Sequence, residues 1–270
     1  MTSMSMQDLI NLRMEVRAFL AENIPDDLEV PRKGGVPSQA TMQWAVEFRR
    51  KLGERGWLAP HWPKYFGGGG LPAQAANVIF EELAQRSLPQ LPVNQLWITP
   101  LRLYGTEEQK GKWLTKTLRG EITVNQILTE PKSGGTDLAN QETVGIRNGD
   151  YFLVNGEKGF SSNPFDPDYL FVLVTTDPDG PKYQNLSMIL IDAHDPGVTM
   201  RKREILTGAT QRAFQFKDVW TPADQIIGGV GNGWTVAQSV LELERGTLGI
   251  TRQQMAEVEA RERAYWEART

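Results

Sequence analysis

The 270-residue chain contains no cysteine and only two histidines, His61 and His194. Without cysteine there can be no disulfide, no thiolate metal site and no cysteine nucleophile. Two histidines also argue against a multi-histidine metal centre, so we expect no bound metal. A cysteine-free chain fits the reducing cytoplasm, which is where we expect this protein to reside.

The chain also lacks an excess of positive charge and any long apolar run. Lys and Arg number 29 against 33 Asp and Glu, a net charge of −4, which gives no signal for nucleic acid. No apolar stretch approaches the roughly 20 residues of a transmembrane helix. The N-terminus has no basic segment followed by a long apolar core, so it does not resemble a signal peptide. We expect neither a nucleic-acid partner nor a membrane span.

Helical spacing of apolar residues marks the first 122 residues. Ala76, Ile79, Phe80 and Leu83 fall on one helix face, with the spacing i, i+3, i+4 and i+7. The segment 106–109, with Thr at its start and Gln three residues on, has the capping-box pattern that opens a helix. The run Gly67–Gly70 is followed by no Lys-Ser/Thr pair, so it predicts a flexible turn and not a phosphate-binding loop.

Short strands with turns between them are predicted from residue 123 to residue 228. The pairs Asn148-Gly149 and Asn155-Gly156 predict hairpin turns of type I′, in which both central residues have positive φ. Strands are expected at 151–154, 169–174, 186–191 and 213–216. This pattern of short strands and turns predicts a β-barrel or sandwich domain.

A helical period returns after Gly231-Asn232-Gly233, which predicts a turn into a helix. Ala237, Val240, Leu241 and Glu244 share one face of that helix, and 253–270 is predicted to be a further, charged helix. The fold class is therefore α+β. We expect an N-terminal helical domain at 1–122, a central β-barrel domain for flavin and substrate at 123–228, and the incomplete opening of a second helical domain at 229–270.

Several short motifs occur in a meaningful order along this pattern. They are Tyr104–Lys110, Thr129-Glu130-Pro131, Asn155–Lys158, Pro196–Val198 and Gly231–Trp234. With the order of helices and strands, these motifs resemble the acyl-CoA dehydrogenase family from about residue 58 to residue 246. The resemblance implies an FAD cofactor, an acyl-CoA substrate and electron-transfer flavoprotein as the electron acceptor.

The resemblance also implies which residues meet the flavin. They are Gln126, Leu128, Thr129, Gly135, Thr136, Phe160 and Ser162. Thr129 would bond the pyrimidine edge, Thr136 would meet the pyrophosphate and Ser162 would lie near flavin N5. A glycine turn exposes backbone N–H groups to phosphate oxygens, which agrees with this assignment. The turn between Pro131 and Thr136 has one residue more than is usual in the family.

Phe160 stands where the family usually has Trp. Phenylalanine keeps a surface on which a flavin ring can stack but loses the indole N–H donor. The residues alone favour an ordinary core aromatic beside a serine-rich turn, since turn hydroxyls are common. Only the resemblance favours a flavin contact.

Glu244 is the expected catalytic base. In the resembling family a carboxylate removes the α-proton of the thioester, and some members carry it in the Glu-Arg step that Glu244 and Arg245 match. A carboxylate beside an apolar stripe is costly to bury, so Glu244 needs either a partner or a function there. The alternative is that Glu244 forms an internal ion pair or lies at the exposed edge of the stripe. Glu130 is expected to be structural.

Three functions fit this sequence. The first is an FAD-dependent acyl-CoA dehydrogenase that needs a missing C-terminal helical domain, or a partner that supplies it, in a homo- or hetero-oligomer. The second is a truncated, non-catalytic paralogue that binds a full-length dehydrogenase. The third is a flavin oxidase or monooxygenase on the same fold, since a fold alone does not choose among functions.

Overall fold

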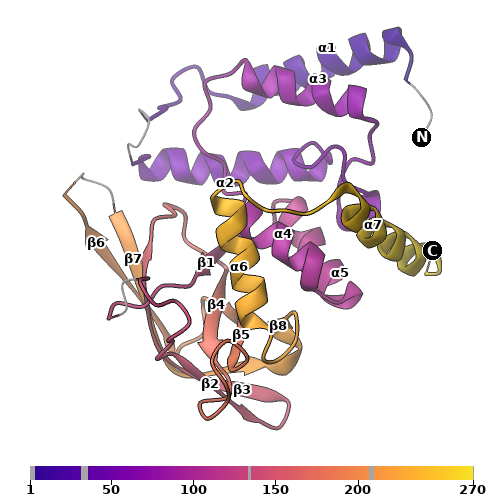
Figure 1. Ribbon diagram of the computed structural model, residues 1–270. Helices are drawn as coiled ribbons and strands as arrows, with labels where there is room; N and C mark the ends of the chain where they lie inside the picture. The colour runs from indigo at the N-terminus through magenta and orange to yellow at the C-terminus, as the bar shows by residue number, and fades with distance from the viewer. Residues whose placement is uncertain (1–3, 32–35, 133–134, 207–209, 270) are drawn as a thin grey trace. The chain divides into compact units, whose positions relative to one another are not determined.

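The computed structural model describes residues 4–31, 36–132, 135–206 and 210–269 (Figure 1). The chain forms two compact units. The first, called the helical unit, comprises Met1–Val93 and Thr115–Glu121, and the second, called the sheet unit, comprises Asn94–Leu114 and Ile122–Thr270. The order of helices, strands and helices confirms the predicted α+β class.

The helical unit contains α1 (Met6–Asn23), α2 (Gln39–Glu54), the 3-10 turn η1 (Lys64–Phe66) and α3 (Ala73–Ala84). Serine hydroxyls at positions 5 and 38 accept backbone N–H groups at the starts of α1 and α2, which satisfies donors that a helix leaves unpaired. Its core is built from Val16, Phe19, Leu20, Phe48, Leu52, Trp57 and Ile79. The predicted face of α3 is buried at Ala76 and Ile79, but Phe80 is 41% exposed.

The glycine run 67–70 is a turn, as predicted, but its backbone is tightly held. The N–H groups of Gly68, Gly69 and Gly70 donate to carbonyls at positions 63, 59 and 62. A Cβ on Gly68 would lie 2.3 Å from the Trp62 carbonyl oxygen. Close backbone approach therefore explains at least this glycine better than flexibility does.

The sheet unit begins with α4 (Gln95–Tyr104) and most of α5 (Glu107–Leu118). The predicted capping box is present at the start of α5. The Gln109 N–H donates to the Thr106 hydroxyl at 3.2 Å, and the Thr106 N–H donates to the Gln109 side-chain oxygen at 2.9 Å. Gln109 also donates to the Ile226 carbonyl at 2.7 Å, which ties α5 to the last strand.

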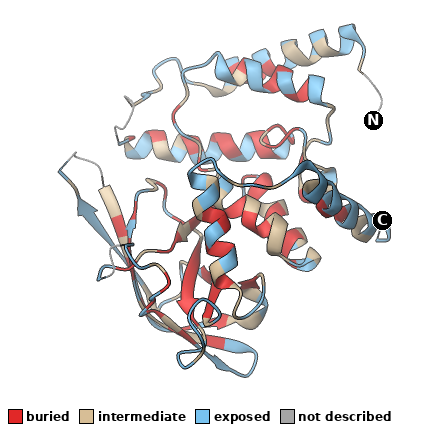
Figure 2. Cartoon of the chain, viewed as in Figure 1, coloured by how far each residue is buried: buried red, intermediate tan, exposed pale blue. Residues whose placement is uncertain are grey.

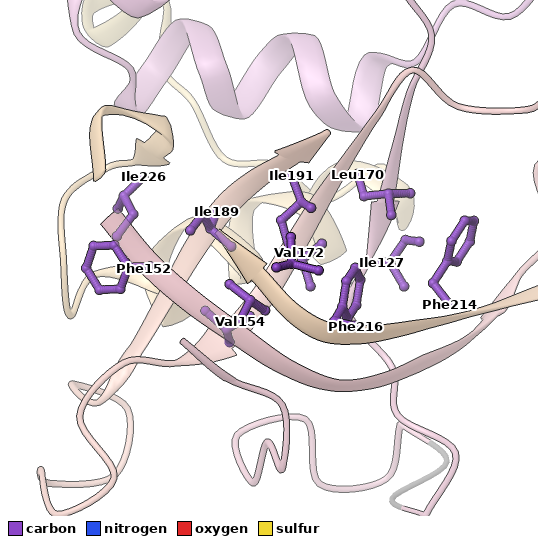
Figure 3. Close-up of a cluster of buried hydrophobic side chains, with 12 residues drawn as sticks. Ile127, Phe152, Val154, Leu170, Val172, Ile189, Ile191, Phe214, Phe216 and Ile226 are labelled. Atoms are coloured by element: carbon purple, nitrogen blue, oxygen red, sulfur yellow. The ribbon is translucent and has the colours of Figure 1, made fainter. Parts of the chain in front are cut away.

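One mixed eight-stranded sheet follows. Its strands are β1 (Val124–Ile127), β2 (Val144–Asn148), β3 (Tyr151–Ser161), β4 (Tyr169–Thr175), β5 (Leu186–Asp192), β6 (Val198–Glu204), β7 (Thr210–Pro222) and β8 (Ile226–Ile227). The order is β6-β7-β3-β2-β4-β5-β8, and β1 pairs in parallel with β4. Phe216 of β7 and Ile189 of β5 belong to one apolar cluster, although three strands separate β7 from β5 in that order (Figure 3). The sheet therefore curls around a single core, as the barrel prediction requires.

The two predicted hairpins differ from expectation. A hairpin does join β2 to β3, but Asn148 pairs with Tyr151, so the central residues are Gly149 and Asp150 and not Asn148-Gly149. Only Gly149 of these two has a positive φ, 60°, as in a turn that places glycine first.

The second hairpin prediction, at Asn155-Gly156, is wrong. These residues lie inside β3, where the register with β7 shifts between Val154 and Gly156. A Cβ on Gly156 would lie 2.6 Å from Thr143 Cα, so glycine is needed for close approach within a bulge. Of these two residues only Gly156 has a positive φ, 147°, and this conformation serves a bulge and not a turn.

Two helices end the sheet unit, as predicted. Helix α6 (Gly233–Glu244) packs on α4, β4 and β5, and α7 (Arg252–Glu267) lies beyond it in the sequence. Figure 2 shows α7 mostly exposed and the central strands mostly buried. In the described residues, no helix is both long and apolar enough to cross a membrane.

Candidate functional site

A cavity of about 320 Å³ lies within the sheet unit, at the end of β1. Its walls come from three segments: the end of β1 with the turn after it, the end of β3 with the loop after it, and the last turns of α6. The lining residues are Gln126, Ile127, Leu128, Thr129, Gly135, Leu138, Gly159, Phe160, Ser161, Ser162, Asn163, Val240, Leu241, Glu244 and Arg245. Seven of the eight residues singled out from the sequence thus lie around one space.

Backbone and side-chain contacts fix the end of β1 against β3. The Gly159 N–H donates to the Thr129 carbonyl at 2.9 Å. The Lys158 amine donates to the Leu128 carbonyl at 3.2 Å. Because both carbonyls are held, the Thr129 side chain projects from a backbone that is anchored on the β3 side of the cavity.

Beneath this anchor lies a buried ion pair between Lys158 and Glu130, with 2.9 Å between Nζ and Oε1. Lys158 also donates to the Gln141 side-chain oxygen. Glu130 accepts the Glu142 and Thr143 N–H groups at 2.7 and 2.8 Å. The Glu130 carboxylate is fully engaged, which agrees with its expected structural role.

The ion pair shifts both ionisation equilibria. Burial lowers the pKa of Lys158 to about 8, although the charge of Glu130 opposes that shift. Burial by itself raises the pKa of Glu130, but the Lys158 charge and the hydrogen bonds from the 142–143 backbone outweigh it and leave the pKa below its ordinary value. Both groups are therefore held as an ion pair near neutral pH.

Phe160 is not the core aromatic that the residues alone favoured. Its side chain is 45% exposed and its φ is +61°, a left-handed conformation that is strained for a bulky residue. The strain falls where the β3–β7 register shifts a second time, between Lys158 and Ser161. The bulge turns the ring out of the sheet and onto the cavity wall.

The loop after β3 is clamped from behind. Asn163 donates to the Asn125 side-chain oxygen at 2.6 Å. Arg212, only 4% exposed, donates to the carbonyls of Asn163 and Pro164 and pairs with Asp166 at 2.8 Å. These contacts hold the chain that carries Ser161 and Ser162, and Ser162 accepts a hydrogen bond from Gln211 at 3.5 Å.

Glu244 and Arg245 provide the charged groups on the cavity wall at the end of α6. Val240 is buried, Leu241 is half-buried and Glu244 is exposed, so the acid stands at the edge of the apolar stripe. Within the described part of the chain Glu244 makes no ion pair. The internal ion pair is therefore excluded for these residues, whereas the exposed stripe edge and the catalytic role both fit this position.

The turn after Pro131 is described only in part. Gly135 lies beside Thr129, because a Cβ on Gly135 would sit 3.4 Å from the Thr129 methyl group. Thr136 is exposed and does not line the cavity. The expected extra residue falls in a segment that includes Ser133 and Gly134, which lie outside the described residues.

Sequence reasoning did not find Leu138, Arg245 or the partner of Gln126. Asn94 donates to the Gln126 side-chain oxygen at 2.7 Å from a position 32 residues earlier. No local motif reports such a pairing. Arg245 follows Glu244 directly, so the Glu-Arg step was the one available signal.

The cavity combines hydroxyl and amide groups with an exposed aromatic ring and one carboxylate. Hydroxyls and amides on an anchored backbone can hold a heteroaromatic ring by its polar edge, and Phe160 can pack on its face. An exposed carboxylate on the opposite segment can accept a proton from a ligand.

Two family models and several relatives match most of this chain. The family model for the acyl-CoA dehydrogenase N-terminal domain matches residues 7–121, and the model for the middle domain matches residues 125–219. Acyl-CoA dehydrogenase FadE29 of Mycobacterium tuberculosis is 34% identical over 202 residues, which cover 74% of this chain and 52% of that protein. Acyl-CoA dehydrogenase IpdE1 of Mycolicibacterium smegmatis is 32% identical over 265 residues, covering 90% of this chain and 67% of that protein.

A solved structure described as the Tcur3481-Tcur3483 steroid ACAD G363A variant has a TM-score of 0.71 and 30% identity, and covers 90% of this chain and 63% of its own. The chain thus spans about half to two-thirds of the length of these relatives.

Proposed function

This chain belongs to the acyl-CoA dehydrogenase family, and we propose that its sheet unit binds FAD and serves the α,β-dehydrogenation of an acyl-CoA thioester. The observation that carries the proposal is the cavity at the end of β1. It gathers Gln126, Leu128, Thr129, Gly135, Phe160, Ser162 and Glu244 from three distant segments. Because the chain spans only part of its relatives, we propose that catalysis also needs further helices or a partner that supplies them.

The donor set of the cavity suits a flavin. The hydroxyls of Thr129 and Ser162 and the amide of Gln126 can bond the polar edge of the ring system, and the exposed Phe160 ring can pack on its face. Gly135, with φ of +77°, exposes backbone near Thr129. In this proposal Thr136, outside the cavity, would meet the pyrophosphate. FAD would supply the acceptor for the hydride that leaves the β-carbon of the substrate.

Glu244 is the proposed base. Its carboxylate would take the α-proton of the thioester, and the electrons of that C–H bond would form the new α,β double bond as the hydride departs. The carboxylate is exposed in this chain, so a bound acyl group would have to exclude water from it. Arg245, beside it on the cavity wall, can bond a carbonyl or carboxylate of the acyl group.

The first test is retention of FAD. The purified chain, alone and co-expressed with candidate partner chains of the same family, is mixed with FAD, stripped of free flavin and examined by visible absorption. We expect a retained flavin spectrum. Colourless protein in every combination would contradict the proposal.

The second test is Glu244→Gln. We expect the flavin-loaded assembly to lose about 100-fold or more in dehydrogenation rate while FAD stays bound, because an amide cannot accept the proton. Glu242→Gln is the matched control, since Glu242 is an exposed acid of the same helix that does not line the cavity. Equal losses in both variants would remove Glu244 from the proposed role.

Partners and substrate follow from the relatives as proposals. The solved structures include the ChsE4-ChsE5 complex from Mycobacterium tuberculosis, with a TM-score of 0.66 and 27% identity, and the steroid ACAD carries the two names Tcur3481 and Tcur3483. We propose a hetero-oligomer for this chain, electron-transfer flavoprotein as acceptor, and a steroid-derived acyl-CoA among the first substrates to assay. A stable complex whose turnover survives Glu244→Gln would instead favour the non-catalytic partner.

A further inference from the structure

Asn94 occupies a position where every polar atom of its side chain has a fixed use. Its Nδ2 donates to the Val124 carbonyl at 2.8 Å and to the Gln126 Oε1 at 2.7 Å. Its Oδ1 accepts the Leu96 N–H at 3.1 Å and caps α4. A flipped amide would face a carbonyl with an oxygen and an N–H with an NH₂ group, so two backbone atoms determine the orientation.

The orientation of Asn94 in turn determines that of Gln126. A donating nitrogen on Asn94 requires the oxygen of Gln126 to face it. The Gln126 nitrogen then points away from Asn94 with two N–H donors, and no described residue accepts a hydrogen bond from it. Gln126 is half-buried and lines the cavity.

We infer that Asn94 is a positioning residue that sets Gln126 as a hydrogen-bond donor to a carbonyl or ring-nitrogen acceptor of the bound flavin. This inference rests on the proposed function for the identity of the ligand. A side chain locked before the ligand arrives binds with less loss of rotamer freedom than a mobile one. The ligand it favours presents an acceptor, since the oxygen of Gln126 is turned toward Asn94 and its two N–H donors are free among the described residues.

The sharpest test is Asn94→Asp. Aspartate still caps α4, but its second oxygen would face both the Val124 carbonyl and the Gln126 oxygen. The Val124 carbonyl belongs to the backbone of β1 and cannot turn, so the glutamine amide should flip and turn an acceptor toward the cavity. In ligand-free protein we expect the Gln126 side-chain NH₂ signals in nitrogen-15 NMR to shift downfield and exchange more slowly, because they would then donate to a carboxylate. Gln126→Glu assigns those signals. Asn148→Asp on the exposed β2–β3 hairpin controls for the added charge. Unchanged Gln126 signals would overturn the inference without reference to any ligand.

A double-mutant cycle tests the role in binding. With FAD as the probe, we expect Gln126→Ala to weaken binding about tenfold and Asn94→Ser, which keeps a capping hydroxyl, to weaken it similarly. The double variant should be no weaker than Gln126→Ala, because Asn94 acts through Gln126. Multiplied losses of about 100-fold, or no loss in Asn94→Ser, would overturn the role. Failure of the wild-type chain to bind FAD in any assembly would instead overturn the proposed function and the ligand assigned here, while the NMR result on the amide orientation would stand.

Discussion

Among single residues, Lys158 has the largest expected effect on the site, because it holds both Glu130 and the Leu128 carbonyl. Lys158→Met would leave a buried carboxylate without its counter-charge. We expect a loss of about 3–5 kcal/mol in the free energy of unfolding of the sheet unit, measured by urea denaturation. Lys132→Met is the control, since the Lys132–Glu142 pair is exposed at the surface and should contribute nothing measurable. Similar losses in both variants would contradict the buried pair's role.

For single residues, local sequence motifs predicted which residues line the cavity, but they did not predict contacts between residues far apart in the chain. Thr129, Phe160 and Glu244 were found from short sequence motifs and a helical period, and all three line one cavity in the structure. Their assigned roles remain predictions. Asn94 escaped notice because its partner lies 32 residues away and the pairing leaves no periodic trace. The exposure of Phe160 was also out of reach, because a left-handed residue at a bulge depends on β-sheet register.

Among the elements, α7 is held on the sheet unit by a buried charge cluster. Glu262 is fully buried and pairs with Arg102 at 2.9 Å and with Lys110 at 3.4 Å. We expect Glu262→Gln to weaken the docking of α7 by about 2 kcal/mol or more, because it leaves two cations with less counter-charge. Hydrogen exchange should become faster in 252–267 and stay unchanged in β4. Glu257→Gln, at an exposed position of the same helix, is the control.

A second variant tests this docking from the other side. A Cβ on Gly111 of α5 would lie 2.5 Å from the Trp266 ring. Alanine normally stabilises a helix relative to glycine by about 1 kcal/mol, but here we expect Gly111→Ala to speed exchange in α7. Unchanged hydrogen exchange of α7 in both Glu262→Gln and Gly111→Ala would contradict the docking of α7 described here.

Helices and strands were predictable from the sequence, whereas the turns and bulges that join or interrupt them were less so. The helices 39–54, 73–84 and 233–244 carry clear apolar periods, and the strands around 169–174 and 186–191 are continuous apolar runs. The bulge at Gly156 was mistaken for a turn because a glycine with positive φ serves both. The bulge is defined by the pairing of β3 with β7, and the close approach of Thr143, 13 residues earlier in the chain, requires glycine there.

For the molecule as a whole, the pH dependence of stability follows from the buried lysine of the sheet unit. Burial lowers the pKa of Lys158 from 10.5 to about 8. Between these two values the unfolded chain holds a proton that the folded chain has released. Unfolding therefore takes up a proton, and this group's contribution to the free energy of unfolding rises with pH from about 8 to 10.5 and is flat just below that window.

The measurement is the free energy of unfolding of the wild type minus that of Lys158→Met, taken by urea denaturation at steps from pH 7 to pH 10.5. The difference removes the titration of groups that the substitution leaves unchanged, and we expect it to grow with pH above about 8. The wild type minus Lys132→Met difference should stay near zero over this range, because that pair is exposed and the pKa of Lys132 is raised above its ordinary 10.5, so the group keeps its proton in both states. A wild-type minus Lys158→Met difference that stays level or falls above pH 8 would show that Lys158 keeps its proton in the folded chain, and the ion pair with Glu130 would then be stronger than its burial implies.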